Sequence, residues 1–295
     1  MTGELAALTT AVLWSCSSIL FTFGGRYVGS TILNRTRLIL GLSYLSILHF
    51  IIYGKFLPIS ASSHNWFWLG LSGIIGLVLG DSALFQAFVL IGPHLSMLIM
   101  TLVPIIGTTF AWIFLSETLS FTKLGGIIFT ISGIIMVVLD KHKMTTINKK
   151  EFIWGILCGI GGAIGQAIGL ILAKKGLVNN FPGLSATVIR VFTATIVIWL
   201  ITLVSGRAKS TISKVMNRKI ILTIAAGAFF GPFLGIWMSV VAVKWAYVGI
   251  ASTIMALPPI ILLPVSYFIF KEKITWKSII GTIIAVSGTA VIFIF

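Results

Sequence analysis

The longest apolar runs of this chain set the limits on its fold. Residues 250–270, for example, carry no charged side chain over 21 positions. A helix needs about 20 consecutive apolar residues to cross the hydrocarbon core of a bilayer. Soluble domains contain roughly 25% charged residues, whereas only 9% of these 295 residues are Asp, Glu, Lys or Arg. We therefore expect lipid, rather than water, to surround most of the chain.

The same runs favour helices over a membrane barrel. Strands of a barrel alternate polar and apolar residues over about ten positions, and the runs here are longer and apolar on all sides. A helix also satisfies its own backbone hydrogen bonds inside a bilayer. The sequence thus predicts an all-α integral membrane protein with ten transmembrane helices. We place them near 4–24, 32–53, 66–91, 94–115, 122–140, 152–173, 183–205, 220–243, 249–270 and 275–294.

The net charge of +15 does not indicate nucleic-acid binding. Lys and Arg lie mostly between the apolar runs, where they meet lipid headgroups, and no basic face with interleaved aromatic residues is present. The four histidines are scattered without metal-ligand spacing. The chain also lacks a phosphate-binding loop and a nucleophile elbow. We therefore expect neither an enzyme nor a bound metal or cofactor.

An internal repeat emerges when the chain is compared with itself. A shift of 155 residues aligns the fourth and fifth predicted spans with the ninth and tenth, and a shift of 153 aligns the second with the seventh. Prolines, glutamates and arginines coincide in a nearly gapless register, which apolar composition alone does not produce. The matched pairs include Pro104 with Pro259, Glu117 with Glu272, Gly126 with Gly281, Gly133 with Gly288, and Arg37 with Arg190.

The repeat divides the chain into two halves of five spans. We expect the first half at residues 1–140, a connecting loop at 141–151 and the second half at 152–295. An odd number of spans makes the second half cross the membrane in the opposite sense to the first. Inverted repeats are typical of alternating-access transporters, whose substrate site lies near the midplane where the halves meet.

Two segments carry a family resemblance. Residues 102–136 and 257–291 each have a mid-span proline, a glutamate where the span ends, and a following helix with glycines seven residues apart. They resemble the terminal motif of the EamA repeat. Residues 11–20, AVLWSCSSIL, are similar to the opening segment of that family, with Ser15 in place of its glycine. The resemblance implies the drug/metabolite transporter superfamily, ten helices, and export or facilitated passage of amino acids and other metabolites.

Three charged side chains inside predicted spans are the strongest candidates for the site. Asp81 lies well within the third span, where a carboxylate costs about 2.5–3.5 kcal/mol on insertion scales. It suits a proton-coupling group or a counter-ion for a cationic solute, or else a buried partner for Arg37 or Arg190. The two arginines are repeat mates. They could capture a carboxylate or phosphate as a guanidinium fork, or snorkel to the headgroups.

Four uncharged side chains complete the predicted substrate-binding set. Gln166 and Trp14 are repeat mates in the first span of each half. An amide at lipid depth needs a partner, which is a substrate or another helix. Gln86 and Trp237 could add hydrogen bonds or stacking to a cavity. Each of the four is also compatible with simple packing.

Glycines spaced four residues apart mark helix contacts. Gly76 and Gly80 form one pair, and Gly161, Gly165 and Gly169 form a longer stripe. Small residues at this spacing let helix backbones approach closely in lipid. Packing is the simpler interpretation. The functional alternative is that these helices slide or rock during a transport cycle.

The sequence therefore predicts a secondary transporter or facilitator in the plasma membrane, with lipid and a small-molecule solute as partners and proton coupling as a subsidiary hypothesis. A flippase for a lipid-linked precursor, or a membrane scaffold without transport, are the alternatives. Orientation stays open. An inward amino terminus places 5 basic residues on the cytoplasmic side against 13 outside, so the positive-inside rule favours external termini, whereas the family resemblance implies cytoplasmic ones.

Overall fold

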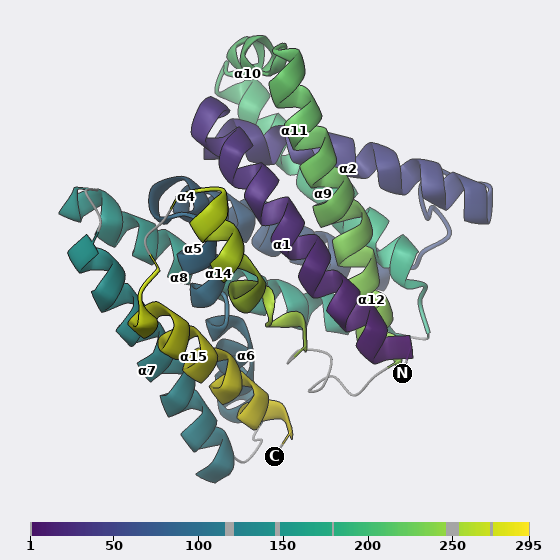
Figure 1. Ribbon diagram of the computed structural model, residues 1–295. Helices are drawn as coiled ribbons and strands as arrows, with labels where there is room; N and C mark the ends of the chain where they lie inside the picture. Colours follow the sequence, from purple (N-terminus) through teal and green to yellow (C-terminus); the bar gives the residue numbers. More distant parts are fainter. Residues whose placement is uncertain are drawn as a thin grey trace.

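The computed structural model describes residues 2–115, 121–144, 148–178, 180–245, 254–271 and 274–294, and every regular element in them is helical (Figure 1). The elements of the first half are α1 (Thr2–Val28), α2 (Ser30–Tyr53), α3 (Ser63–Gly73), η1 (Ile74–Gly80), α4 (Asp81–Ile91), α5 (Pro93–Ile99), α6 (Leu102–Leu115) and α7 (Phe121–Met144). Those of the second are α8 (Lys149–Gly176), α9 (Gly183–Val204), α10 (Ala208–Val215), α11 (Arg218–Ala228), η2 (Phe229–Gly235), α12 (Ile236–Trp245), α14 (Pro258–Phe268) and α15 (Trp276–Ile294).

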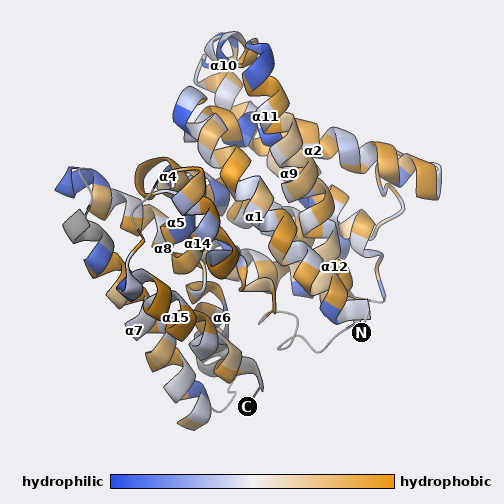
Figure 2. Cartoon of the chain, in the orientation of Figure 1, coloured by the Kyte–Doolittle hydropathy of each residue, from blue (hydrophilic) through white to orange (hydrophobic). Residues whose placement is uncertain are grey.

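Seven helical segments of the described chain are long and apolar enough to cross a membrane. Three further apolar helices, Pro93–Gly107, Pro258–Phe268 and Trp276–Ile292, are shorter and overlap the remaining expected spans. The second of them follows residues 246–253, which lie outside the described part. Figure 2 shows hydrophobic residues along the long helices and hydrophilic ones gathered around α10. These features are those of a multi-pass membrane protein.

Two π-helical segments occupy matching positions in the two halves. η1 runs from Ile74 to Gly80 and η2 from Phe229 to Gly235, so both boundaries are related by the same shift of 155 residues. Pro232 inside η2 lacks a backbone donor, which disturbs α-helical bonding. Such π-helical turns are rare and occur frequently at functional sites.

Close packing of α8 against η1 brings the two halves together. A methyl group on Gly165 would lie 2.6 Å from the Cα atom of Gly80, and one on Gly169 would lie 3.0 Å from that of Gly76. Only glycine permits these backbone approaches. The packing interpretation of the glycine spacing is thus confirmed at Gly165 and Gly169.

Repeat-mate helices pack against each other in antiparallel pairs. On α7 and α15, which lie side by side in Figure 1, Gly126 approaches Gly288 while Gly133 approaches Gly281. Residue numbers rise on one helix as they fall on the other, so the two run in opposite directions. Between these contacts, the Thr130 hydroxyl donates to the carbonyl of Ala285, at 3.2 Å.

The pair formed by α2 and α9 follows the same pattern. The Thr195 hydroxyl donates to the Leu38 carbonyl at 3.4 Å, and the Trp199 indole donates to the Arg35 carbonyl at 3.3 Å. Leu38 therefore faces Thr195 while the earlier residue Arg35 faces the later residue Trp199. This antiparallel contact places Arg37 and Arg190, one from each half, in the interior of the bundle.

Candidate functional site

A buried ion pair joins α2 to the start of α4. The Arg37 guanidinium donates from Nη2 to Oδ2 of Asp81, and the two residues are only 3% and 6% exposed. Asp81 is the first residue after η1. Arg37 also donates from Nε to the Asn34 side chain at 2.9 Å, and its guanidinium lies 4.6 Å from the ring centroid of Phe85. These contacts hold the arginine in one orientation by charge, hydrogen bonding and cation–π attraction.

Gln166 connects this ion pair to the second half of the chain. Its Nε2 donates to the other carboxylate oxygen of Asp81 and, at 3.3 Å, to the carbonyl of Gly76 in η1. Both oxygens of Asp81 thus accept a hydrogen bond, one from each half. The Gly76 carbonyl also accepts the backbone N–H of Asp81, so the same oxygen bonds both η1 and Gln166.

Asn34 belongs to the same cluster, although it was absent from the predicted set. Its Nδ2 donates to the Leu77 carbonyl at 3.1 Å and to the Ser82 hydroxyl at 2.8 Å, and the residue is fully buried. The signal was present in the sequence, because Asn34 is an amide inside a span and lies three residues before Arg37, on the same helix face. The argument applied to Gln166 would have selected it.

Arg190 reaches the cluster from α9 without joining its hydrogen bonds. The residue is 6% exposed, and its Nε is buried and lacks a partner. Its side chain forms neither a hydrogen bond nor an ion pair with any residue that the structure describes. Asp81 attracts it only through space. A methyl group on Gly76 would lie 3.6 Å from Nη2 of Arg190, which places this guanidinium beside η1.

The other three predicted site residues lie elsewhere. Gln86 accepts a hydrogen bond from the Ser30 hydroxyl at 2.5 Å, where α2 begins. Trp14 packs on η2, with its Cδ1 atom 2.7 Å from the position of a methyl group on Gly235. Trp237 lines a cavity on another part of the bundle. The structure thus brings together Asp81, Arg37, Gln166 and Arg190, and separates Gln86, Trp14 and Trp237 from them.

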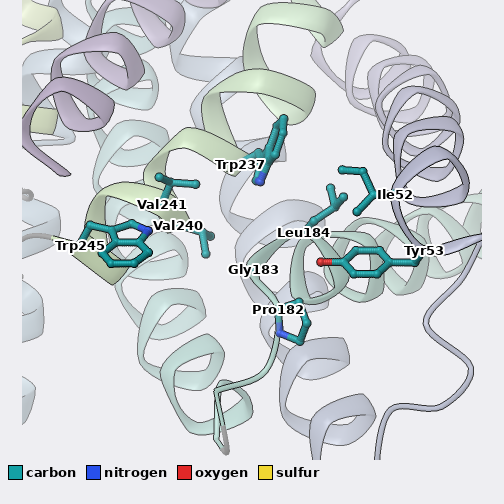
Figure 3. A pocket seen from close by; sticks show the side chains of 9 residues that line it. All are labelled: Ile52, Tyr53, Pro182, Gly183, Leu184, Trp237, Val240, Val241 and Trp245. Atoms are coloured by element: carbon teal, nitrogen blue, oxygen red, sulfur yellow. The ribbon is translucent and has the colours of Figure 1, made fainter. Parts of the chain in front are cut away.

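The cavity lined by Trp237 has a volume of about 200 Å³ (Figure 3). It lies between the end of α2, the start of α9 and α12, and Figure 3 shows the Tyr53 hydroxyl and the Trp237 indole nitrogen directed toward it. Trp237 and Leu184 also pack in the apolar cluster that includes Leu77 and Val78, whose carbonyls face Asn34. An apolar layer therefore stands between this cavity and the charged cluster.

Glu117 and Glu272, which the repeat aligns, lie outside the described residues.

Comparison with known sequences identifies the family. The sequence model of the EamA-like transporter family matches residues 1–139 and again residues 153–294. The chain belongs to the EamA-like transporter family. This family belongs to the drug/metabolite transporter superfamily, and EamA proteins are transporters rather than enzymes. The resemblance inferred from the proline, glutamate and glycine spacing is confirmed.

Comparison with known structures concerns the fold alone. A solved structure titled "Crystal structure of protein" is similar to this EamA-like chain with a TM-score of 0.65 and 15% sequence identity. The similarity covers 98% of this chain and 95% of that one. No curated protein matches the chain.

Proposed function

We propose that the protein is a secondary transporter or facilitator of a small polar metabolite in the plasma membrane, and that it works by alternating access, in the direction of efflux. Ten spans form two inverted halves, residues 1–140 and 152–295, joined by the loop 141–151. The solute binds near the midplane, between the halves. Membrane lipid surrounds the protein, and no cofactor takes part.

The charged cluster is the observation that carries this proposal. Arg37 and Asp81 come from the first half, and Gln166 and Arg190 from the second, yet all four meet in the interior. Ionisable residues inside a bilayer are costly and generally mark substrate or ion pathways. A scaffold without transport needs no such group. The place where two repeats meet is also where transporters of inverted architecture bind their solutes.

The helix pairing supports the inverted arrangement. Gly126 against Gly288 and Gly133 against Gly281 make α7 and α15 antiparallel, although each is the repeat mate of the other. The contacts between α2 and α9 have the same sense. Two halves that run in opposite directions present the same five-helix unit to both sides of the membrane. Rocking of one against the other would then open the cluster to each side in turn.

We further propose that Asp81 links solute movement to protons. Its two carboxylate oxygens accept hydrogen bonds from opposite halves, through Arg37 and Gln166. Protonation would remove the negative charge that holds Arg37 and would weaken both bonds. Uptake of one proton would therefore loosen the Gln166 bond that connects the halves, and loss of the proton would restore it.

Solute counterflow in proteoliposomes tests the proposal. Purified protein would be screened with amino acids, amines, nucleotide precursors and organic acids, with and without a pH gradient. Saturable accumulation of one class is expected, and Asp81→Asn should abolish its dependence on the gradient. Gln166→Ala should reduce the rate. Arg218→Gln, at an exposed helix start, is the matched control and should behave as wild type.

Two outcomes would contradict this proposal. If Asp81→Asn keeps gradient-driven accumulation, proton coupling through Asp81 is wrong. If folded protein exchanges no solute, transport of a soluble metabolite is wrong, and a lipid-flipping assay with fluorescent lipid in the same vesicles tests the flippase alternative.

A further inference from the structure

The buried cluster contains one more positive charge than negative. Arg37, Arg190 and Asp81 are each at most 6% exposed, and Asp81 is the one carboxylate placed among them by the described residues. Arg37 uses that carboxylate directly, whereas Arg190 does not. An arginine stays protonated at all physiological pH values. A net charge of one unit therefore remains in this cluster.

Among the residues that the structure describes, the second half does not supply the missing carboxylate. The repeat mate of Asp81 is Ile236, which packs in the apolar cluster around Leu184 and Val188. The mate of Asn34 is Thr187, whose hydroxyl donates to the Gly183 carbonyl of its own helix, at 2.9 Å. The second half thus keeps the arginine and lacks both groups that hold Arg37 in place.

The Arg190 guanidinium lies against Gly76 of η1. A methyl group added to Gly76 would have Nη2 of Arg190 at 3.6 Å, the Cα of Gly169 at 3.7 Å and Oε1 of Gln166 at 3.8 Å. All three are ordinary van der Waals distances. The side-chain position of Gly76 thus has room for one methyl group, and Nη2 of Arg190 borders it.

We propose that the transported solute is an anion, and that its carboxylate or phosphate group docks on Arg190 beside Gly76. This inference rests on the proposed transport function and adds the charge class of the solute. An unneutralised guanidinium in a low-dielectric interior is unfavourable, and an oxyanion removes that cost with two parallel hydrogen bonds. A cation would increase the excess charge, and a neutral solute would leave it unchanged.

The arrangement gives the two arginines different roles. Arg37 is occupied by Asp81 and Asn34, so it acts as a fixed strut between helices. Arg190 keeps its hydrogen-bond donors for the solute. The cavity beside Gly183 and Leu184 lies six to seven residues before Arg190 on α9, about 10 Å along the helix axis. It lies on the path that an anion would take if the apolar layer between them separates.

A binding screen with matched solutes tests the charge class. Detergent-purified protein in low-chloride buffer would be heated with carboxylates and phosphate monoesters of two to six carbons, each beside its neutral amide or alcohol and its amine. Glutarate, glutaramide and 1,5-diaminopentane form one set, and glycerol 3-phosphate with glycerol forms another. At least one acid should raise Tm in a saturable way, while its neutral and cationic counterparts do not. The acid that works distinguishes carboxylate from phosphate.

Variants of Arg190 locate the effect. Arg190→Met should weaken binding of the stabilising acid by about 10- to 100-fold, as loss of a charged hydrogen bond predicts, and Arg190→Lys should restore part of it. Gly76→Ala should also weaken binding, because its methyl group would lie 3.6 Å from Nη2 of Arg190 and crowd a bound oxyanion. Gly161→Ala, whose nearest neighbour would be 3.9 Å away, is the matched control and should bind as wild type.

Three results would overturn the proposal. They are stabilisation by neutral or cationic solutes alone, stabilisation by an acid that Arg190→Met retains in full, and no stabilisation by any acid. Chloride that stabilises as well as every acid, without counterflow of acids, would make Arg190 a resident-ion site and likewise overturn it. Counterflow distinguishes failure of the anion proposal from failure of the transport proposal. Exchange of amines or neutral solutes would support transport and contradict an anionic solute. Acid binding without any exchange would support the anion site and contradict transport.

Discussion

Arg37 and Arg190 occupy equivalent positions in the two halves but have different surroundings. Both are buried, at 3% and 6% exposure. Arg37 has a carboxylate, an amide and an aromatic ring around its guanidinium, whereas Arg190 has no hydrogen bond to the described residues and a buried Nε without a partner. Arg37 stabilises the packing of its helices through these contacts, whereas Arg190 adds an unneutralised buried charge.

The difference shows how a duplicated chain can divide two tasks between equivalent residues. Removing one member of a buried pair leaves an uncompensated charge and is strongly destabilising. Removing a buried charge that had no partner should instead stabilise the folded protein. Residues kept for function commonly lower the stability of a protein. Substitution of Arg37 should therefore destabilise the protein, whereas substitution of Arg190 should stabilise it.

Arg37→Met should have the largest effect on stability. It leaves the Asp81 carboxylate buried with only Gln166 as donor, and we expect a loss of about 3–5 kcal/mol. Thermal unfolding in detergent measures it. The double variant Arg37→Met with Asp81→Leu should recover much of the loss, because no buried charge of that pair remains. A loss no greater than that of Arg190→Met would remove the contrast between the two arginines.

Gly73→Ala should destabilise the contact that positions Arg190. The added methyl group would lie 2.2 Å from the Arg190 carbonyl oxygen, so α3 and α9 must separate, at a cost of about 1–3 kcal/mol for overpacking. Gly76→Ala, three residues later, has room for its methyl group and should unfold near the wild-type temperature. Equal Tm values for the two variants would show that α9 does not approach α3 this closely.

Asn34→Ala should have an intermediate effect. It removes the acceptor of Arg37 Nε and the donor to the Leu77 carbonyl, and a buried unsatisfied group costs about 1–3 kcal/mol. Chemical unfolding of the purified protein measures the change. Thr187→Ala at the equivalent site of the second half is the matched control. Its hydroxyl bonds only within α9, so a loss as large as that of Asn34→Ala would contradict the asymmetry.

Arg190→Met should change the stability least, and it should raise stability where the other three substitutions lower it. Loss of an uncompensated buried charge is expected to stabilise the solute-free protein by on the order of 1 kcal/mol. Thermal unfolding without added anions measures it. Clear destabilisation would mean that Arg190 has a structural role like that of Arg37.

Much of the site could be predicted from the sequence because charges inside apolar spans are conspicuous. Asp81, Arg37, Arg190 and Gln166 were selected as polar residues at membrane depth, and they meet. Trp14 and Trp237 were selected as aromatic residues, and aromatic side chains pack equally well against lipid, helices or solutes, so their type did not show where they lie. Asn34 was overlooked although it obeys the rule that selected Gln166.

The sequence by itself determined the class of the protein, its apolar helical character and its two EamA-like segments. Apolar run length, sparse charge and the proline and glycine register are local properties that survive without three-dimensional information. Only the tertiary structure decided which arginine takes Asp81. The repeat makes Arg37 and Arg190 equivalent in sequence, and a hydrogen bond depends on distances of a few tenths of an ångström that arise from how η1, α8 and α9 pack at their glycines.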